Sequence, residues 1–368
     1  EESRQRRKGD SLGWILQPSV ELKAITKKAL PLLIAVLFAN FGHGQEKPGD
    51  TQTKTSSISP QALRDLFKPY MKVLEHDQVM LKKSSARIEL GRVLFYDRRL
   101  SLKSEVSCND CHDLAKHGTN GDHYTQLLKQ KKTKRDVPSI YNKGGLKLFN
   151  WDGSHTTLKS KTTSAITSEH EMNMANTGLL IQRLKGITGY QSLFTKAFPR
   201  DKDSLKLETL VEALVSFEKA LITPAPIDRF MAGNDKALSA EQLEGGLLFD
   251  RKFCATCHTG TMFGGQMLQK LGAVRSWPNQ KDLGYYYTTK VPEHKMIFRV
   301  SSLRNVEKTA PYFHDASSRH LWDAVRKIAW HELGQFVSVK EALSIQEFLK
   351  ALTGDIPKEL IKKPNLPK

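Results

Sequence analysis

Apolar residues recur at helical spacing in several segments, and each such segment predicts an amphipathic helix. The longest stripe predicts a helix from about 205 to 221, formed by Leu207, Leu210, Val211, Leu214, Phe217 and Leu221. Near the C-terminus, Ser338 and Glu341 match a capping box. The stripe that follows it consists of Ala342, Ile345, Leu349 and Leu352. These stripes are expected to form plain hydrophobic core.

Two shorter segments resemble each other and predict an internal duplication. Residues 90–97 read LGRVLFYD, and residues 244–250 read EGGLLFD. Leu90, Val93 and Leu94 share one helical face, so each copy predicts a short helix. A repeat at this distance along the chain is typical of two domains of similar build.

The remaining pattern sets the expected domain boundaries. The helix near 221 ends at residues 223–226, which read Thr-Pro-Ala-Pro and mark a junction. We therefore expect one domain over 60–222 and a second over 223–368. Residues 272–299 carry glycine, proline and three consecutive tyrosines, which predicts a long loop or a short hairpin. Strand content should be small.

The first residues are typical of an export signal. Lys23, Lys27 and Lys28 precede an apolar run at 29–41, and small residues allow cleavage after Gly44. The run is shorter than a standard membrane span, although an uncleaved anchor is the alternative. Residues 1–44 are thus assigned to a signal region with an uncertain start, and 45–59 to a flexible lead-in. Export predicts a periplasmic protein without stable membrane insertion after cleavage.

Composition narrows the class further. The 368 residues include 57 lysines and arginines against 39 acids, a net charge of +18. Apolar residues make up 39% and mean hydropathy is −0.45, which excludes a polytopic membrane protein and a disordered chain. The positive charge alone suggests a nucleic-acid partner. Export and the lack of a recognised binding motif argue against one.

All four cysteines fall in two copies of the motif C-x-x-C-H. The copies are Cys108, Cys111 and His112, and Cys254, Cys257 and His258. This spacing puts two thiols on one turn, where they can add to the vinyl groups of haem, and the histidine then binds the iron. The motifs predict two covalently bound haem c groups. Two zinc or dithiol sites are the alternative.

Several further motifs resemble the bacterial di-haem cytochrome c peroxidases, a family that includes MauG. The resemblance covers roughly residues 60–357. Its motifs lie at 90–101, 107–108, 138–142, 151–153, 171–172, 264–265, 303–305 and 309–314. It implies a mainly α fold with two cytochrome c-like haem domains in tandem and long irregular loops. In this family peroxide usually reacts at the N-terminal haem, and the C-terminal haem relays electrons.

The resemblance also implies roles for single residues. Glu171 matches the distal glutamate, whose carboxylate can take a proton from peroxide and return it to the leaving oxygen. Trp151 matches an electron relay between the haems. One Ca²⁺ is implied between the domains, with Asp136 in the place of the usual asparagine and the carbonyls of Thr309 and Pro311 as ligands. Carboxylate oxygen is an acceptable calcium ligand.

The first departure from the family pattern concerns the N-terminal haem. Many members hold a reversible distal histidine there, and the matching position is Leu128. His117 and His123 lie in the same loop at other offsets and could replace it if the loop is rearranged. We expect a haem that is open without reductive activation. The basic residues at 129–135 form either a solvated face or a guide for an acidic donor protein.

Two further departures affect the haem surroundings. Lys161 stands where glutamine is usual, and if it approaches Glu171, its ammonium would favour the ionised form of that carboxyl. Ile328 stands where a methionine usually binds the second haem. His331, one turn on, could replace it. The alternatives are Met267, Met296, Tyr285 to Tyr287, or a vacant position.

The sequence therefore predicts a periplasmic di-haem peroxidase that reduces hydrogen peroxide to water. A small c-type cytochrome or cupredoxin would donate the electrons, and the basic chain favours an acidic or neutral donor. Family members are often homodimers. Two alternatives stay open: a MauG-like enzyme that oxidises a protein side chain, and a non-catalytic electron carrier.

Overall fold

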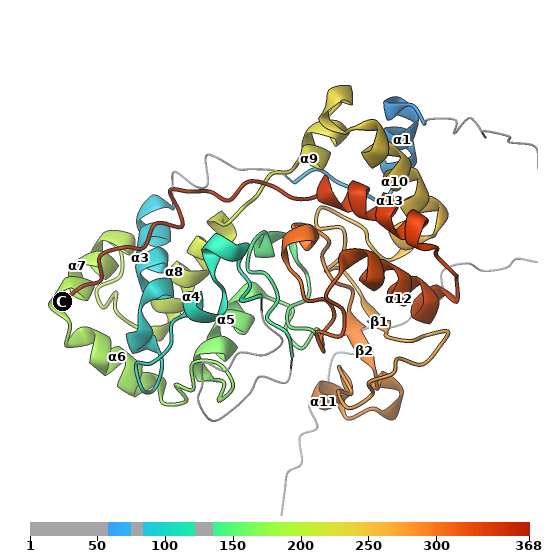
Figure 1. Ribbon diagram of the computed structural model, residues 1–368. Helices are drawn as coiled ribbons and strands as arrows, with labels where there is room; N and C mark the ends of the chain where they lie inside the picture. Colours follow the sequence, from blue (N-terminus) through green and yellow to red (C-terminus); the bar gives the residue numbers. More distant parts are fainter. Residues whose placement is uncertain (1–57, 75–83, 122–134) are drawn as a thin grey trace, which may run out of the picture. The chain divides into compact units, whose positions relative to one another are not determined.

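The computed structural model describes residues 58–74, 84–121 and 135–368 (Figure 1). The predicted signal peptide and most of the lead-in lie outside these residues. The described part is mainly helical, which confirms the predicted fold class. The helices are α1 (Pro60–Phe67), α3 (Ser85–Tyr96), α4 (Cys108–Cys111), α5 (Leu158–Thr167), α6 (Thr177–Lys185), α7 (Thr188–Ala197), α8 (Leu207–Ala220), α9 (Pro226–Met231), α10 (Ala240–Arg251), α11 (Tyr286–Thr289), α12 (Leu321–Leu333) and α13 (Val339–Lys350).

The predicted duplication appears as two helix pairs of the same design. In the first half α3 packs on α8, and in the second half α10 packs on α13. A glycine lets each pair approach closely. A Cβ atom at Gly91 would overlap the carbonyl oxygen of Ala213, and one at Gly245 would overlap that of Ser344. The repeated glycine in the two sequence copies thus has one physical reason: backbone contact between helices.

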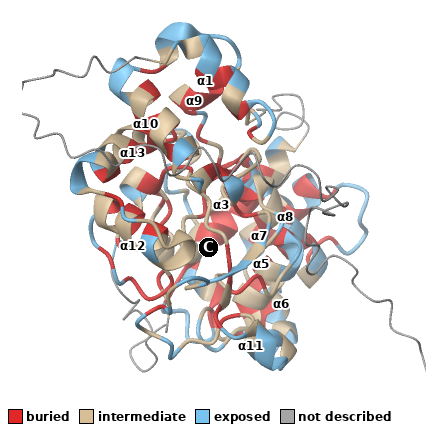
Figure 2. Cartoon of the chain, turned by 90° about the vertical axis from the view of Figure 1, so that its right-hand side faces the viewer, coloured by how far each residue is buried: buried red, intermediate tan, exposed pale blue. Residues whose placement is uncertain are grey.

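Each helix pair belongs to its own hydrophobic core. The first core is built from residues of α3, α6, α7 and α8, including the fully buried Phe95, Tyr190 and Phe217. The second is built from α10, α12 and α13, with Phe249 and Phe348 at its centre. Figure 2 shows buried and exposed residues on opposite sides of the same helices. The amphipathic stripes read from the sequence therefore face these cores.

Helix α1 and the C-terminal tail each pack against the core of the opposite half. Helix α1 contributes Leu63 and Phe67 to the second core, although it precedes the first haem motif. The C-terminal tail packs Ile356 and Leu360 against the first core, and the carbonyl of Ile361 accepts a 2.6 Å hydrogen bond from Tyr96 (Figure 1). The expected boundary at 222–223 does separate the central helices. As a domain boundary it stays a prediction.

A buried polar network lies at that boundary. Thr223 donates its backbone N–H to Asn142 Oδ1 at 2.8 Å, and its hydroxyl accepts from Asn142 and Asn305 at 2.8 and 2.9 Å. All three residues are buried. Because buried amides left without partners are costly, this network fixes how the segments around 142, 223 and 305 meet.

The local predictions for the second half agree with the structure. Ser338 and Glu341 form the expected capping box, with hydrogen bonds of 2.9 and 3.2 Å between the side chains and the backbone. Strands β1 (Leu268–Lys270) and β2 (Ile297–Arg299) pair antiparallel, and β2 forms the end of the segment 272–299, which also contains the short helix α11 that the sequence did not predict. No helix among the described residues has both the length and the apolar character that crossing a bilayer requires.

The helix contact at Gly91 generates a stability prediction. Gly91→Ala places a methyl group against the Ala213 carbonyl, so we expect the free energy of unfolding to fall by about 1–3 kcal/mol. Gly186→Ala is the matched control, because its Cβ would meet no atom closer than 3.4 Å. Urea unfolding of the haem-loaded protein measures both. Equal stability of the two variants would contradict the close contact.

Candidate active site

The first motif is shaped by a short capped helix. Helix α4 runs from Cys108 to Cys111, and Ser107 caps it together with Asp110, whose carboxylate accepts from the Ser107 backbone at 2.8 Å. Arg98 donates to the same carboxylate at 2.9 and 3.0 Å. His112 follows directly. This turn presents both thiols and the histidine within five residues.

The second motif reaches the same arrangement through a 3₁₀ turn at Cys254–Thr256. His258 Nδ1 lies 3.0 Å from the carbonyl of Phe263, and His112 Nδ1 lies 3.1 Å from that of Gly118. A carbonyl only accepts, so Nδ1 carries the proton and Nε2 is left to bind iron. Burial lowers the pKa of His112 to about 3 and also lowers that of His258. Both rings are thus neutral, as metal ligands must be.

The surroundings of the cysteines favour haem attachment over a zinc site. Burial, followed by the nearby Glu171 and Asp110 carboxylates, raises the pKa of Cys111 to about 12. Burial also raises the pKa of Cys108, Cys254 and Cys257. A buried thiol with a raised pKa is not a reactive thiolate, which argues against a dithiol redox site. Within 58–74, 84–121 and 135–368, no three His, Cys, Asp or Glu side chains form a metal-binding group.

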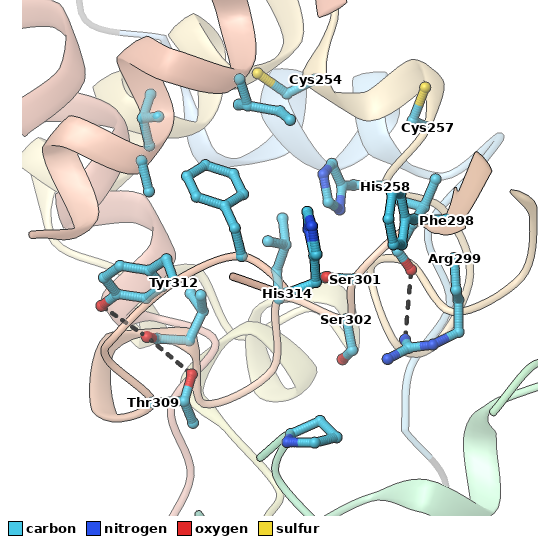
Figure 3. A pocket seen from close by; sticks show the side chains of 18 of the residues that line it. Cys254, Cys257, His258, Phe298, Arg299, Ser301, Ser302, Thr309, Tyr312 and His314 are labelled. Atoms are coloured by element: carbon cyan, nitrogen blue, oxygen red, sulfur yellow. Dashed lines mark hydrogen bonds between the residues drawn. The ribbon is translucent and has the colours of Figure 1, made fainter. Parts of the chain in front are cut away.

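A large, mostly apolar cavity surrounds the second motif (Figure 3). Cys254, Cys257 and His258 lie along one wall, and residues of α12 line another. Tyr312 and His314 project into the same space from the 309–314 segment. A cavity with the three attachment side chains at its wall and an apolar interior fits a covalently bound haem.

Helix α12 shows which of the predicted sixth ligands line this cavity. Ile328 lines the cavity as predicted, and Glu332 lines it one turn further on. His331 does not; its Nδ1 lies 2.9 Å from the carbonyl of Arg275, and its ring lines a pocket on the other side of α12. The remaining candidates, Met267, Met296 and Tyr285 to Tyr287, also lie outside the cavity lining. The structure therefore brings none of the proposed replacement ligands to this cavity.

Glu332 is a cavity residue that sequence reasoning missed. One carboxylate oxygen accepts from the backbone N–H of Gly272 at 2.5 Å, whereas Oε2 is buried without a hydrogen-bond partner. Burial raises the pKa of Glu332. The position four residues after Ile328 could have revealed it, since that step returns to the same helical face.

Lys161 and Glu171 form the predicted contact beside the first motif. Lys161 Nζ donates to both carboxylate oxygens of Glu171, at 2.7 and 2.8 Å. Helix α5 carries the lysine, and Glu171 lies in the turn after α5, where its N–H donates to Ser168. The carboxylate is near enough to contribute to the raised pKa of Cys108 and Cys111. The predicted acid/base group is therefore held next to the haem attachment site.

Two more charges lie buried in the same region and were not predicted. Lys143 and Glu218 are both buried, and Thr162 donates to the Glu218 carboxylate at 3.3 Å. Burial lowers the pKa of Lys143 and raises that of Glu218, while the opposite charge of each acts against this effect in the other. Lys143 and Lys161 also contribute to the lowered pKa of His112. The first site thus has two buried opposite charges, Lys143 and Glu218, beside its motif.

Trp151 and the implied calcium ligands meet at the other end of the cavity. The indole N–H of Trp151 donates to the carbonyl of Asp136 at 2.8 Å, and Thr309 and Pro311 line the same cavity. Asp136 Oδ1 is buried without a hydrogen-bond partner, and burial raises the pKa of the carboxyl to about 8. An unpartnered buried carboxylate oxygen fits a bound cation.

The loop that should contain the distal position is only partly described. Leu128 and His123 lie outside the described residues, as do the basic residues before Arg135. Arg135 itself is no solvated charge, because it donates to Asp152 and to Asp282, at 2.7 and 2.5 Å. His117 has its ring beside Tyr141, with centroids 6.3 Å apart.

Comparison with known proteins places the chain in a family. The family model of the di-haem cytochrome c peroxidases matches residues 85–236. The cytochrome c551 peroxidases of Pseudomonas aeruginosa and Nitrosomonas europaea are 33% and 32% identical to it, over 77% and 76% of this chain and 83% of each relative. The methylamine utilization protein MauG of Methylophilus methylotrophus is 33% identical over 64% of this chain and 70% of its own.

A solved structure shares the fold. A MauG-like protein associated with microbial copper homeostasis superposes with a TM-score of 0.66 at 24% identity, covering 76% of this chain and 92% of its own. The chain therefore belongs to the di-haem cytochrome c peroxidase family. It is an oxidoreductase with two haem c groups, which sets aside the non-catalytic carrier.

The orphaned Asp136 carboxyl predicts a pH-dependent stability. Its raised pKa means that the calcium-free folded protein keeps a proton that the unfolded chain releases above about pH 4. This stabilisation is complete below the unfolded pKa and is lost as the pH rises through about 8. We expect unfolding free energy to fall by up to about 1.4 kcal/mol per pH unit in that window.

Urea unfolding of the chelator-treated, haem-loaded protein from pH 5 to 8 measures this slope. Asp136→Asn should remove it, and the exposed Asp203→Asn should leave it unchanged. A slope that persists in Asp136→Asn would show that another group causes it.

Proposed function

We propose that this enzyme reduces hydrogen peroxide to water in the periplasm, with electrons from a small c-type cytochrome or cupredoxin. Relatives at 32–33% identity are named cytochrome c551 peroxidases, which supports the reaction and the kind of donor. The observation that carries the proposal is the Glu171 carboxylate, held by Lys161 next to the first haem motif. A positioned carboxylate is what proton transfer to and from peroxide requires.

Glu171 acts as the acid/base group of the reaction. Its carboxylate takes a proton from the peroxide and returns it to the departing oxygen, which leaves as water; two electrons from the donor and two protons from solvent complete the conversion of one peroxide into two waters. Lys161 orients this carboxylate by donating to both of its oxygens. Bound haem, held through His112 and His258, supplies the iron that exchanges electrons with peroxide.

Trp151 carries electrons between the two haem sites in this proposal. Its ring lies in the cavity of the second motif, and it is fixed by the hydrogen bond to the Asp136 carbonyl. Calcium at Asp136, Thr309 and Pro311 would hold that carbonyl in place. A calcium ion at this site would link Trp151, through the Asp136 carbonyl, to the segment that begins after the basic residues.

The net positive charge of the chain predicts the charge of its electron donor. A chain with 57 basic and 39 acidic residues repels a basic donor and attracts an acidic or neutral one. Turnover with an acidic donor should therefore fall as ionic strength rises. A homodimer is part of the proposal through family resemblance alone.

A second candidate function is MauG-like oxidation of a protein side chain. The observation that favours it is Ile328, which faces the second cavity where a methionine ligand is usual, with no proposed replacement in the cavity lining. The two functions differ in kinetics. Peroxide reduction predicts fast oxidation of a reduced cytochrome, whereas side-chain oxidation predicts slow cytochrome oxidation and a long-lived oxidised state.

The acid/base role predicts a large loss of activity in Glu171→Gln. The amide cannot accept the proton, so kcat/KM for peroxide should fall by about 10²–10⁴-fold, while both haems still attach. The control is Glu105→Gln, an exposed glutamate near the first motif. Peroxide-dependent oxidation of a reduced c-type cytochrome measures both variants. Wild-type rates in Glu171→Gln would refute the assignment.

Lys161→Gln tests the contact that orients Glu171. Without the two hydrogen bonds from the ammonium, the Glu171 carboxylate loses its fixed orientation, so kcat/KM for peroxide should fall by about tenfold or more. Exposed Lys159→Gln, two residues away on α5, is the control. An unchanged kcat/KM in Lys161→Gln would mean that the contact has no part in proton transfer.

A further inference from the structure

Trp277 lies between the second cavity and the protein surface. It is 3% exposed and packs with Met296 and Phe298 in a small cluster that also contacts Trp151. Its ring meets Phe313 edge-on at 4.6 Å between centroids and His331 at 5.0 Å. Phe313 lines the cavity of His258, and His331 lines a separate surface pocket. The Trp277 ring thus lies between the cavity of His258 and the surface pocket of His331.

The hydrogen bond of Trp277 is unusual for a core tryptophan. Its indole N–H donates to the buried carboxylate of Asp315 at 3.2 Å, whereas Trp151 donates to a neutral carbonyl. Asn279 donates to the same Asp315 oxygen at 3.2 Å. Burial alone would raise the pKa of Asp315, but hydrogen bonds from Ser317 and Trp277 and the nearby His314 keep it below the ordinary value. The indole therefore faces an ionised carboxylate.

A buried anion changes what the indole can do. In a medium of low dielectric constant, a negative charge next to the ring strongly stabilises positive charge on it. Removing one electron from Trp277 is therefore easier than from a tryptophan bonded to a neutral carbonyl. For packing alone, the anion brings only a desolvation cost.

The outer end of this path is an aromatic surface with a basic rim. Trp330 and Phe336 are 43% and 69% exposed and line the pocket that contains His331, together with Arg326, Lys327 and Asp323, which pairs with Lys327 at 2.7 Å. The Arg275 guanidinium stacks over Trp330 at 3.8 Å. The opposite face of α12 lines the second cavity. An acidic redox protein could dock here and stand one helix away from that cavity.

We propose that Trp277 is an electron relay between this surface and the second haem site. The inference rests on the proposed peroxidase function, since peroxide supplies the oxidant. Trp277 gives up one electron toward the oxidised second haem site, and its N–H proton stays within the hydrogen bond to Asp315. One electron from the donor protein, arriving past Trp330 and His331, then restores Trp277. Two such cycles supply the two electrons that each peroxide consumes.

Rapid-freeze electron paramagnetic resonance tests the radical. Haem-loaded protein is mixed with hydrogen peroxide without a donor, and an indole radical is expected in the wild type. Trp277→Phe should abolish that signal and Asp315→Asn should lower it by about tenfold, because the stabilising charge is lost. Trp322→Phe, a partly buried tryptophan of the second core outside the path, is the control and should keep the signal. The same radical yield in Trp277→Phe and wild type would overturn the proposal.

A second measurement needs no peroxide, and it distinguishes failure of the Trp277 relay from failure of the proposed peroxidase function. A photo-oxidisable ruthenium complex on Lys327→Cys withdraws electrons from the reduced haems after a flash. Trp277→Phe should slow haem oxidation by about tenfold or more, while Trp322→Phe should not. Equal rates would overturn the relay even if peroxide turnover is fast. A slowed rate in a protein that ignores peroxide would support the relay and refute the proposed function.

Discussion

Each haem-binding histidine depends on one hydrogen bond from its Nδ1 to a backbone carbonyl. The two acceptors, Gly118 and Phe263, both have left-handed backbone torsions, with φ of 71° and 49°. These turns place the acceptor carbonyl six residues after His112 and five residues after His258. The bond fixes the neutral tautomer, which leaves Nε2 available to bind iron. The helix pairs that make close contact at Gly91 and Gly245 support these turns on the two hydrophobic cores.

Around this common plan the two halves have become chemically different. The first site gathers Lys161, Glu171, Lys143 and Glu218 close to its motif, and this polar surrounding suits proton transfer. The second site is an apolar cavity, with aromatic rings leading away from it. In the proposed mechanism, this difference separates proton transfer at the first site from electron delivery at the second. In the proposed mechanism each half needs the other.

The sequence predicted those features whose partners are close along the chain or repeated in a pattern. The motifs, the stripe of α8 and the cap at Ser338 are of this kind. The Lys161–Glu171 contact was raised as a hypothesis from a departure from the family pattern, and the structure contains it. His331 shows the limit of helical arithmetic. A step of three residues rotates about 60° away from Ile328, whereas the step of four to Glu332 rotates only about 40° the other way. Packing decides between such near neighbours.

Long-range pairs could not be predicted. Trp277 and Asp315 are brought together by two loops, and nothing local marks either as a partner of the other. The packing of α1 on the second core could not be predicted either, because an amphipathic helix carries no signal for which of two cores it will cover. Such choices depend on loop paths and on shape complementarity, which a pattern of apolar residues does not encode.

The most direct test of the account is to mix the fully oxidised, haem-loaded protein with hydrogen peroxide and a reduced small c-type cytochrome. Stopped-flow spectroscopy would follow cytochrome oxidation with and without prior reduction of the haems. The account predicts fast oxidation, two cytochromes per peroxide, without prior reduction. Turnover that appears only after prior reduction would contradict an open first site, and no turnover in either state would contradict the peroxidase function.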